Sequence, residues 1–199
     1  MKLFIIRHGQ TDANVKEIMQ GWLDLKLNDK GIKQAKLLAK RLKKEKIDAF
    51  YSSDLKRAVM TAEEVLKYHN KRLVKTSLLR ELNFGYLEGI SYEKYVETFK
   101  CYCLKRHEFR NPKGESYEDL KKRVNIFLKD VLRKHKNQNV AIFAHGITNR
   151  VIISELLNLS PEKAAEIRQE NTCVNIIEIS SKPKLISLND YSHLNGNAF

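Results

Sequence analysis

Two histidine–glycine pairs stand in matching settings in this sequence. His8 follows a short apolar run at residues 2–6, His145 follows a second run at residues 139–144, and a glycine comes directly after each histidine. Short, continuous apolar runs are typical of strands that are buried on both faces of a sheet. If the two strands are parallel neighbours, their carboxyl ends lie at one edge, where α/β proteins bind ligands. We therefore expect both imidazoles to reach the same cleft.

Two arginines accompany these histidines. Arg7 directly precedes His8, and Arg57 falls in the first turn of the helix expected after a strand at residues 47–53. Arg57 by itself could be a surface residue paired with Asp54, three positions earlier. Together with Arg7, it would place two guanidinium groups beside two imidazoles, an arrangement that needs an anionic ligand. Because guanidinium groups bind phosphate oxygens bidentately, the pattern predicts a phosphate-binding pocket.

Strands and helices alternate along the chain, and these elements must position the four side chains. Apolar periodicity predicts helices over residues 28–46, 54–69, 114–135 and 149–159, and another from Pro161 onward. Asn28 and Ser116 are the expected N-caps of two of them, with Asp119 at the capping-box position after Ser116. The runs at 173–180 and 184–189 predict a terminal hairpin.

This order of elements indicates an α/β fold. We expect a three-layer αβα sandwich with a mostly parallel sheet, because helices between strands cover both faces of such a sheet. The pattern becomes irregular after residue 83, where aromatic and basic residues mix. We therefore expect one domain over residues 1–199, with a small cap inserted at about residues 84–115.

The composition of the chain limits its partners and its location. There are 37 Lys and Arg residues against 24 Asp and Glu, a net charge of +13, which suits nucleic acid, an anionic membrane or an anionic substrate. The lysines are spread along the chain, so we interpret most of them as the coating of helix faces and do not expect nucleic acid as a partner. No apolar run approaches the roughly 18 residues of a membrane span. The 3 cysteines cannot all pair and none lies in a CxxC, which favours the reducing cytoplasm and no metal site.

The sequence resembles the histidine phosphatase superfamily, in the branch of cofactor-dependent phosphoglycerate mutases and their small phosphatase relatives. Its matching segments follow the family order over nearly the whole chain: RHGQTDAN, QGWLD, LNDKGIKQA, YSSDLKRAVMTA, RELNFGYLEG, GES, and AHG followed by Arg150. The chain departs from the family at Ile18, where members often carry an arginine, at Asn28 in place of threonine, and in AHG in place of SHG. Ile18 removes a cation near the phosphate and bears on affinity rather than mechanism.

The resemblance implies a role for each matching residue. His8 would be the nucleophile that becomes phosphohistidine, and Glu81 the general acid, with Glu88 ranked below it. The phosphate would be bound by Arg7, Asn14, Gln20, Gly21, Arg57, His145 and Gly146. The resemblance requires no metal and no other cofactor.

The chemistry explains why arginines flank the nucleophile. An imidazole attacks phosphorus only when it is unprotonated, and its ordinary pKa of about 6.5 leaves that form marginal at neutral pH. Arg7 and Arg57 should lower the pKa of His8, because neighbouring positive charges disfavour imidazolium. Both arginines, together with a protonated His145, would then stabilise the transferring phosphoryl group. Glu81 would protonate the leaving alkoxide and then deprotonate the attacking water.

The sequence thus predicts a metal-independent phosphomonoesterase that acts on a small phosphorylated metabolite. Two alternatives remain open: a cofactor-dependent phosphoglycerate mutase, and a non-enzymatic basic module that binds RNA or another polyanion. The inserted segment is short compared with that of full-length mutases, which favours hydrolysis. The terminal hairpin offers an edge strand, so a homodimer is also left open.

The predicted cap does not name the substrate. Its cations Lys94, Lys105, Arg106 and Arg110 would suit a carboxylate, as in phosphoserine or phosphoglycerate, and a ribazole phosphate of cobalamin synthesis is a third candidate. Its aromatic residues are predicted to form a small core of the cap: Tyr92, Tyr95, Phe99 and Tyr102.

Overall fold

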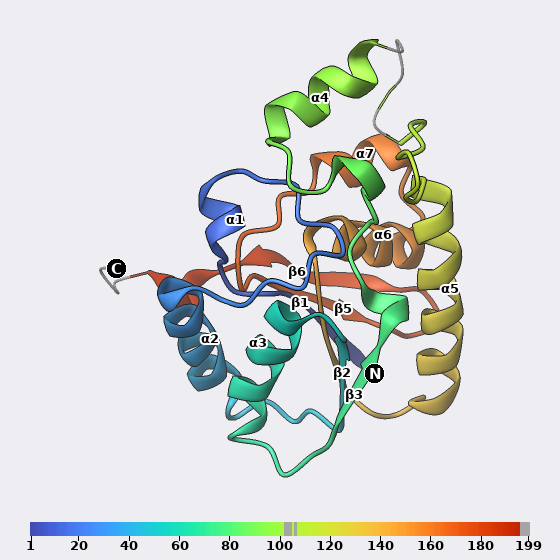
Figure 1. Ribbon diagram of the computed structural model, residues 1–199. Coiled ribbons are helices and arrows are strands. Elements are labelled where there is room, and N and C mark those ends of the chain that lie inside the picture. The colour runs from blue at the N-terminus through green and yellow to red at the C-terminus, as the bar shows by residue number, and fades with distance from the viewer. Residues whose placement is uncertain (102–104, 106, 196–199) are drawn as a thin grey trace.

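The computed structural model describes residues 1–101, 105 and 107–195, and it is built around one six-stranded sheet (Figure 1). The strand order is β3-β2-β4-β1-β5-β6. The strands are β1 (Lys2–Arg7), β2 (Ala49–Ser53), β3 (Leu73–Thr76), β4 (Val140–Ala144), β5 (Val174–Glu178) and β6 (Lys184–Asp190). The first four are parallel to one another, whereas β5 and β6 run antiparallel as the predicted hairpin. The expectation of a mostly parallel sheet is confirmed.

The sheet places the two histidine-bearing strands side by side. β4 pairs with β1 on one side and with β2 on the other, and the β1 register brings Arg7 opposite Ala144. His8 and His145 therefore leave the same edge of the sheet from adjacent strands. Arg57 follows β2, the third strand of this group. In the sheet, β2 and β3 lie on one side of the β4–β1 pair, and β5 and β6 lie on the other. The order of the strands therefore reverses at this pair, and the carboxyl ends of strands at such a point are the usual ligand site of open α/β sheets.

Helices cover both faces of the sheet, so the three-layer sandwich is confirmed. They are α1 (Asp12–Val15), α2 (Asp29–Leu42), α3 (Lys56–Leu66), α4 (Tyr92–Cys101), α5 (Tyr117–Lys134), α6 (Gly146–Leu157) and α7 (Pro161–Glu166). β1 alternates between the two layers: Phe4 and Ile6 pack into the core with α2 and α3, and Leu3 and Ile5 into the core with α5 and α6. None of the described helices is long and apolar enough to cross a membrane.

The predicted helix starts agree with the caps. Asn28 accepts a hydrogen bond from the Gly31 amide (2.8 Å) at the start of α2, and Ser116 and Asp119 form a capping box at the start of α5. The ends agree less well. α2 ends at Leu42 and not at residue 46, because the residues that follow are almost all exposed lysines and glutamate with no apolar side to bury. α6 begins at Gly146, directly after His145, and not at residue 149.

The segment predicted as an irregular cap contains a regular helix, α4, which stands at the top of Figure 1, apart from the sheet. The buried Tyr95 is surrounded by Phe84, Phe99 and Phe109, with ring centroids 5.1, 5.7 and 6.4 Å away. The buried side of α4 is thus packed by these aromatic contacts. It lacks the regularly spaced aliphatic residues from which a helix is usually predicted in sequence. Tyr102, Cys103 and Arg106 lie outside the described residues.

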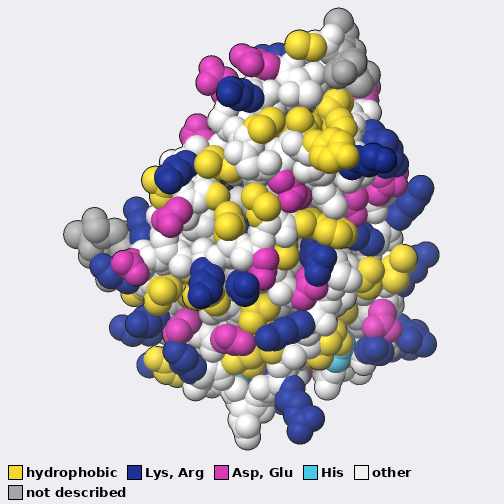
Figure 2. All heavy atoms as spheres, viewed as in Figure 1, with side chains coloured by type: hydrophobic (Ala, Val, Ile, Leu, Met, Phe, Trp, Pro, Cys, Tyr) yellow, Lys and Arg dark blue, Asp and Glu magenta, His cyan; other side chains and the backbone are white. Residues whose placement is uncertain are grey.

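The surface charge is distributed as the sequence suggested. Figure 2 shows Lys and Arg side chains scattered over the visible face, with acidic side chains between them. β6 is the edge strand of the sheet, and Leu185, Ile186 and Leu188 on it are exposed. Pairing of this edge with a second copy stays a prediction.

Candidate active site

The side chains of His8 and His145 face each other at the carboxyl edge of the sheet. Their ring centroids are 5.2 Å apart and both residues are buried. Two imidazoles at this distance cannot both be charged without strong repulsion. The prediction that they share one site is therefore met by the geometry, and their charge states must be established separately.

His8 is held as a neutral imidazole with one free nitrogen. Its Nδ1 lies 2.7 Å from the carbonyl oxygen of Gly9, which can only accept, so Nδ1 carries the proton. The Nε2 lone pair is consequently available for attack on an electrophile. Burial is the largest cause that holds the pKa of His8 well below its usual range, and Arg57 and Arg7 lower it further. The arginine effect was expected from the sequence, whereas the dominant effect of burial was not.

The loop that carries His8 packs directly against the first turn of α2. A Cβ added to Gly31 would lie 2.0 Å from the Gln10 carbonyl oxygen, and one added to Gly9 would lie 2.7 Å from the Gly31 carbonyl oxygen. The Gly9 amide also donates to Thr61 Oγ1 (3.0 Å), and the Thr172 amide donates to the His8 carbonyl (3.2 Å). Contacts from three elements thus fix the position of the His8 backbone.

His145 is neutral too, which corrects the expectation that it is protonated. Burial, followed by the charge of Arg57, holds the pKa of His145 well below its usual range. Arg57 Nε donates to His145 Nδ1 at 3.2 Å, so the imidazole proton is on Nε2. This buried Nε2–H has no hydrogen-bond partner among the described residues. An unsatisfied buried donor costs about 1–3 kcal/mol, which a ligand oxygen would recover.

Arg57 is fully buried and belongs to the pocket rather than to the surface. Besides the bond to His145, its Nη1 and Nη2 donate to the carbonyl oxygens of Leu23 and Gly21, each at 2.7 Å. Three of the five guanidinium N–H groups are used in this way, which leaves one on each Nη for a ligand. Asp54, the surface partner considered from the sequence, instead pairs with Arg80 at 2.6 Å.

The residues predicted to contact phosphate surround a cavity of about 270 Å³. The predicted residues that line it are Arg7, His8, Asn14, Gln20, Gly21, Arg57, Glu81 and Gly146, and His145 lies beneath them, fully buried. The amide oxygens of Asn14 and Gln20 accept bonds from Thr11, so their NH₂ groups are the ends that can donate to a ligand. Arg7 binds the Gln169 carbonyl through Nη1, and its buried Nε has no partner in the described part of the chain.

Seven further residues line the cavity that sequence reasoning did not assign to the site: Ile18, Met19, Phe84, Tyr92, Ile147, Arg150 and Gln169. Tyr92 was predicted as part of the cap core. Arg150 closes the AHG segment quoted above, but nothing in its spacing indicates that it reaches the pocket. Because both histidines are neutral, the cations that line the cavity are the three arginines Arg7, Arg57 and Arg150. This positive charge suits a phosphate monoester dianion.

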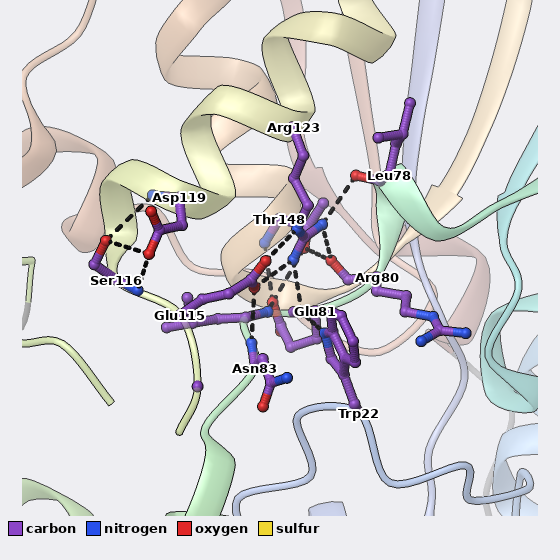
Figure 3. Close-up of polar contacts among 12 residues, drawn as sticks. Trp22, Leu78, Arg80, Glu81, Asn83, Glu115, Ser116, Asp119, Arg123 and Thr148 are labelled. Carbon is purple, nitrogen blue, oxygen red and sulfur yellow. Dashed lines mark hydrogen bonds and ion pairs between the residues drawn. The ribbon is translucent and has the colours of Figure 1, made fainter. Parts of the chain in front are cut away.

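Glu81 lines the cavity, and its carboxylate lies beside Thr148 in the first turn of α6 (Figure 3). Its Oε2 accepts from the Ile147 amide and its Oε1 from the Thr148 amide, both at 3.1 Å, the usual place for a carboxylate at a helix N-terminus. Glu88, the second candidate, is not among the residues that line the cavity. Its Oε1 accepts from the Trp22 amide (2.8 Å), so Glu88 supports the loop that carries Gly21.

Comparison with known proteins shows the family of this chain. Residues 3–190 match the histidine phosphatase superfamily (branch 1). The chain belongs to this superfamily.

Relatives and solved structures agree with this assignment. Phosphoserine phosphatase 1 of Hydrogenobacter thermophilus is 33% identical, with 98% of this chain and 94% of that protein covered. A 2,3-bisphosphoglycerate-dependent phosphoglycerate mutase of Bartonella henselae is 34% identical over 81% of this chain and 84% of its own. A mutant phosphoserine phosphatase from Entamoeba histolytica, solved in complex with phosphoserine, superposes with a TM-score of 0.86 at 28% identity, covering 97% of this chain and 98% of that one.

The chain is therefore a histidine phosphatase, a phosphoric monoester hydrolase of small phosphorylated metabolites. The alternative of a non-enzymatic polyanion-binding module is set aside by this result.

The described cap cations of this histidine phosphatase, Lys94, Lys105 and Arg110, do not line the cavity, contrary to expectation. Lys105 pairs with Glu162 at 3.7 Å and Arg110 with Asp119 at 2.6 Å. Neither they nor Lys94 line the cavity, and Arg106 lies outside the described residues. A cation that does line the cavity, and was not predicted, is Arg150 from α6.

The neutral histidines make the stability of this histidine phosphatase sensitive to acid. In the unfolded chain His8 and His145 titrate near pH 6.5, whereas in the folded protein their pKa values lie well below it. Below pH 6.5 the unfolded state binds protons that the folded state does not, so stability is full above that pH and falls with acidification. Each histidine contributes about 1.4 kcal/mol per pH unit, so we expect a loss of roughly 3 kcal/mol between pH 7.5 and 5.5.

Urea unfolding at the two pH values measures this loss. His193, whose pKa burial and Arg41 lower to about 4, acts in the same direction. The matched variant is His8→Ala, which removes one of the two fully buried histidines and should shrink the difference. A free energy of unfolding that is constant or higher at pH 5.5 would contradict the neutral assignment.

Proposed function

We propose that this chain is a metal-independent phosphomonoesterase that works through a phosphohistidine on His8. The observation that carries the proposal is the free Nε2 of His8, held in a buried, cationic pocket 5.2 Å, ring to ring, from His145. The nucleophile is neutral and in a fixed tautomer, and two buried donors of the pocket, Arg7 Nε and His145 Nε2–H, lack partners among the residues that the structure describes. Positioning and electrostatic stabilisation are the main requirements for phosphoryl transfer.

In the first step His8 Nε2 attacks phosphorus and forms the P–N bond, while the P–O bond to the leaving group breaks. Glu81 donates a proton to the departing oxygen, so that an alcohol leaves rather than an alkoxide. Arg7 Nε, His145 Nε2–H and the two remaining N–H groups of Arg57 stabilise the charge on the three phosphoryl oxygens.

In the second step water attacks the phosphorus of phosphohistidine. Glu81, now ionised, takes a proton from this water as the new P–O bond forms, which restores its protonated state. The P–N bond breaks, its electron pair returns to His8 Nε2, and inorganic phosphate leaves. Splitting hydrolysis into two transfers in this way divides one high barrier into two lower ones.

The non-phosphate half of the cavity favours a small leaving group with a carboxylate. Ile18, Met19, Phe84 and Ile147 provide apolar contacts, and Arg150 provides the cation. A cavity of about 270 Å³ suits a metabolite of few atoms. The names of the compared phosphatases point the same way, so phosphoserine is our first candidate, ahead of 3-phosphoglycerate and ribazole phosphate.

A panel of phosphorylated metabolites assayed with EDTA tests this function. We expect release of inorganic phosphate that EDTA does not reduce, fastest for a substrate with a carboxylate near the phosphate. Loss of activity in EDTA that added divalent cation restores would contradict the metal-independent mechanism. The measurement is phosphate release by a colorimetric assay.

The mutase alternative is tested in the same panel. 3-Phosphoglycerate is supplied with a bisphosphoglycerate primer, and both 2-phosphoglycerate and free phosphate are followed. Isomerisation that greatly exceeds phosphate release would overturn the assignment as a hydrolase.

A further inference from the structure

One arginine of α5 holds the main chain that leads to Glu81. Arg123 Nη1 donates to the carbonyl oxygens of Leu78 (2.9 Å) and Arg80 (2.6 Å), and its Nη2 donates to that of Glu81 (2.8 Å) (Figure 3). One guanidinium thus binds three carbonyls within four residues that have no strand or α-helix to fix them. The proposed function does not use this arginine.

Glu115, from the GES segment, fixes the orientation of Arg123. Its Oε1 accepts from Arg123 Nε at 2.8 Å and its Oε2 from Nη2 at 2.9 Å, a bidentate pair. Arg123 is 12% and Glu115 16% exposed in the side chain, so solvent screens the pair only weakly. A planar fork with five donors matches this set of acceptors, which a lysine ammonium cannot do.

Glu115 also belongs to the base of the predicted cap. Its Oε2 accepts from the Asn83 amide (3.0 Å), and its own amide donates to the Asn83 carbonyl (2.8 Å). Residue 83 directly precedes the predicted cap segment and residue 115 ends it, so the two ends of the cap meet at the Arg123–Glu115 pair. The same pair therefore joins the base of the cap to the main chain of Glu81.

We propose that Arg123, oriented by Glu115, is a positioning residue for Glu81. By fixing residues 78–81 it holds the Glu81 carboxylate at the N-terminus of α6, beside the cavity. Trp22 Nε1 also donates to the Glu81 carbonyl (2.8 Å), and Thr148 Oγ1 donates to the Arg80 carbonyl (2.8 Å), but neither contacts all three carbonyls. This inference rests on the proposed role of Glu81 as the general acid.

Two substrates with different leaving groups distinguish a displaced general acid from general damage to the active site. An alkyl phosphate such as phosphoserine needs a proton on its departing oxygen, whereas p-nitrophenolate is a stable anion that leaves without one. A displaced Glu81 should therefore lower kcat/KM for phosphoserine and spare kcat/KM for p-nitrophenyl phosphate, because kcat/KM reports the first transfer and not the later hydrolysis of phosphohistidine, where Glu81 acts as the base for both substrates. Loss of fold or of the phosphate pocket would slow both equally.

The experiment measures kcat/KM for both substrates in Arg123→Lys, Arg123→Met, Glu115→Gln and Glu81→Gln. Should phosphoserine prove a poor substrate, the best alkyl phosphate of the metabolite panel takes its place. We expect Arg123→Lys to lose about 100-fold on the alkyl phosphate, the effect of a displacement of roughly 1 Å. On p-nitrophenyl phosphate it should stay within about threefold of the wild type, because no acid is needed there. The matched control is Arg133→Lys on the same helix, whose side chain is 76% exposed, and it should change neither value.

The outcomes separate this inference from the function on which it rests. If Glu81→Gln lowers kcat/KM equally for both substrates, Glu81 is not the acid, and both its acid role and the positioning role of Arg123 fall, whereas the phosphohistidine on His8 is tested separately by labelling. If Glu81→Gln is selective for the alkyl phosphate but the folded Arg123→Lys and Glu115→Gln variants are not, the positioning role alone is wrong. Thermal melting identifies which variants fold, and Arg123→Lys keeps the charge beside Glu115 should Arg123→Met fail to fold.

Discussion

Replacing His8 with alanine is expected to lower kcat for phosphomonoester hydrolysis by about 10⁵–10⁶-fold, the usual cost of removing a catalytic nucleophile. The free Nε2 of His8 is the atom that forms the P–N bond in the proposed mechanism. The variant should still bind phosphate, because Arg7, Arg57 and His145 remain. Rapid-quench labelling with a ³²P-phosphomonoester should give an acid-labile, base-stable label on the wild type and none on His8→Ala.

His135→Ala is the control for this experiment. His135 ends α5 and contacts Tyr51 Oη at 2.9 Å, near the start of β4 and thus at the opposite end of that strand from His145. It should keep both turnover and label. A label that persists in His8→Ala, or a label that appears on His135, would place the nucleophile elsewhere and overturn the mechanism.

The buried strands and the two histidines at their ends could be predicted from the sequence for a physical reason. A strand buried on both faces must be apolar throughout, so the polar residue that follows it marks the sheet edge without knowledge of the rest of the fold. His8 and His145 both stand at such a boundary, and the pairing of β1 with β4 then brings them together. Helix caps are equally local, which is why Asn28 and Ser116 could be predicted.

What could not be predicted depends on contacts between distant parts of the chain. The place of Arg57 in the pocket was predicted, but the partners that hold it there were not: its donors bind carbonyls of residues 21 and 23, and Asp54 binds Arg80. Arg150 reaches the cavity only because α6 starts at the sheet edge, and Gln169 arrives from the loop before β5. No periodic pattern in the sequence predicts these contacts between distant segments.

The protonation of His145 illustrates the same limit for electrostatics. A phosphate pocket suggests a charged imidazole when only residue types are known. Burial is the larger influence in the folded protein, and it keeps the pKa of His145 well below its usual range. Desolvation depends on how many atoms surround a side chain, which is a property of the packed structure and not of the neighbouring residues in sequence.

Arg57 should show the second-largest effect, and lysine should not replace it. Its guanidinium binds His145 Nδ1 and the carbonyls of Leu23 and Gly21, and it offers two further N–H groups to the phosphoryl oxygens. Lysine has three donors on one atom and cannot meet these acceptors at once. We expect kcat/KM to fall about 10³–10⁵-fold in Arg57→Lys and in Arg57→Met, the range found when an arginine is removed from a phosphoryl-transfer site.

The pH dependence of kcat/KM distinguishes the effect of the Arg57 charge from the effect of its hydrogen-bond geometry. Arg57 is the largest single charge that lowers the pKa of His8 and of His145, so its removal should raise both. The pH at which kcat/KM falls on acidification should move upward in Arg57→Met and much less in Arg57→Lys, which keeps a positive charge nearby. Activity of Arg57→Lys within tenfold of the wild type would show that the fork geometry is dispensable. An unchanged acid limb in Arg57→Met would show that burial alone keeps His8 neutral, and the arginine beside a nucleophilic histidine would then serve only to bind phosphate.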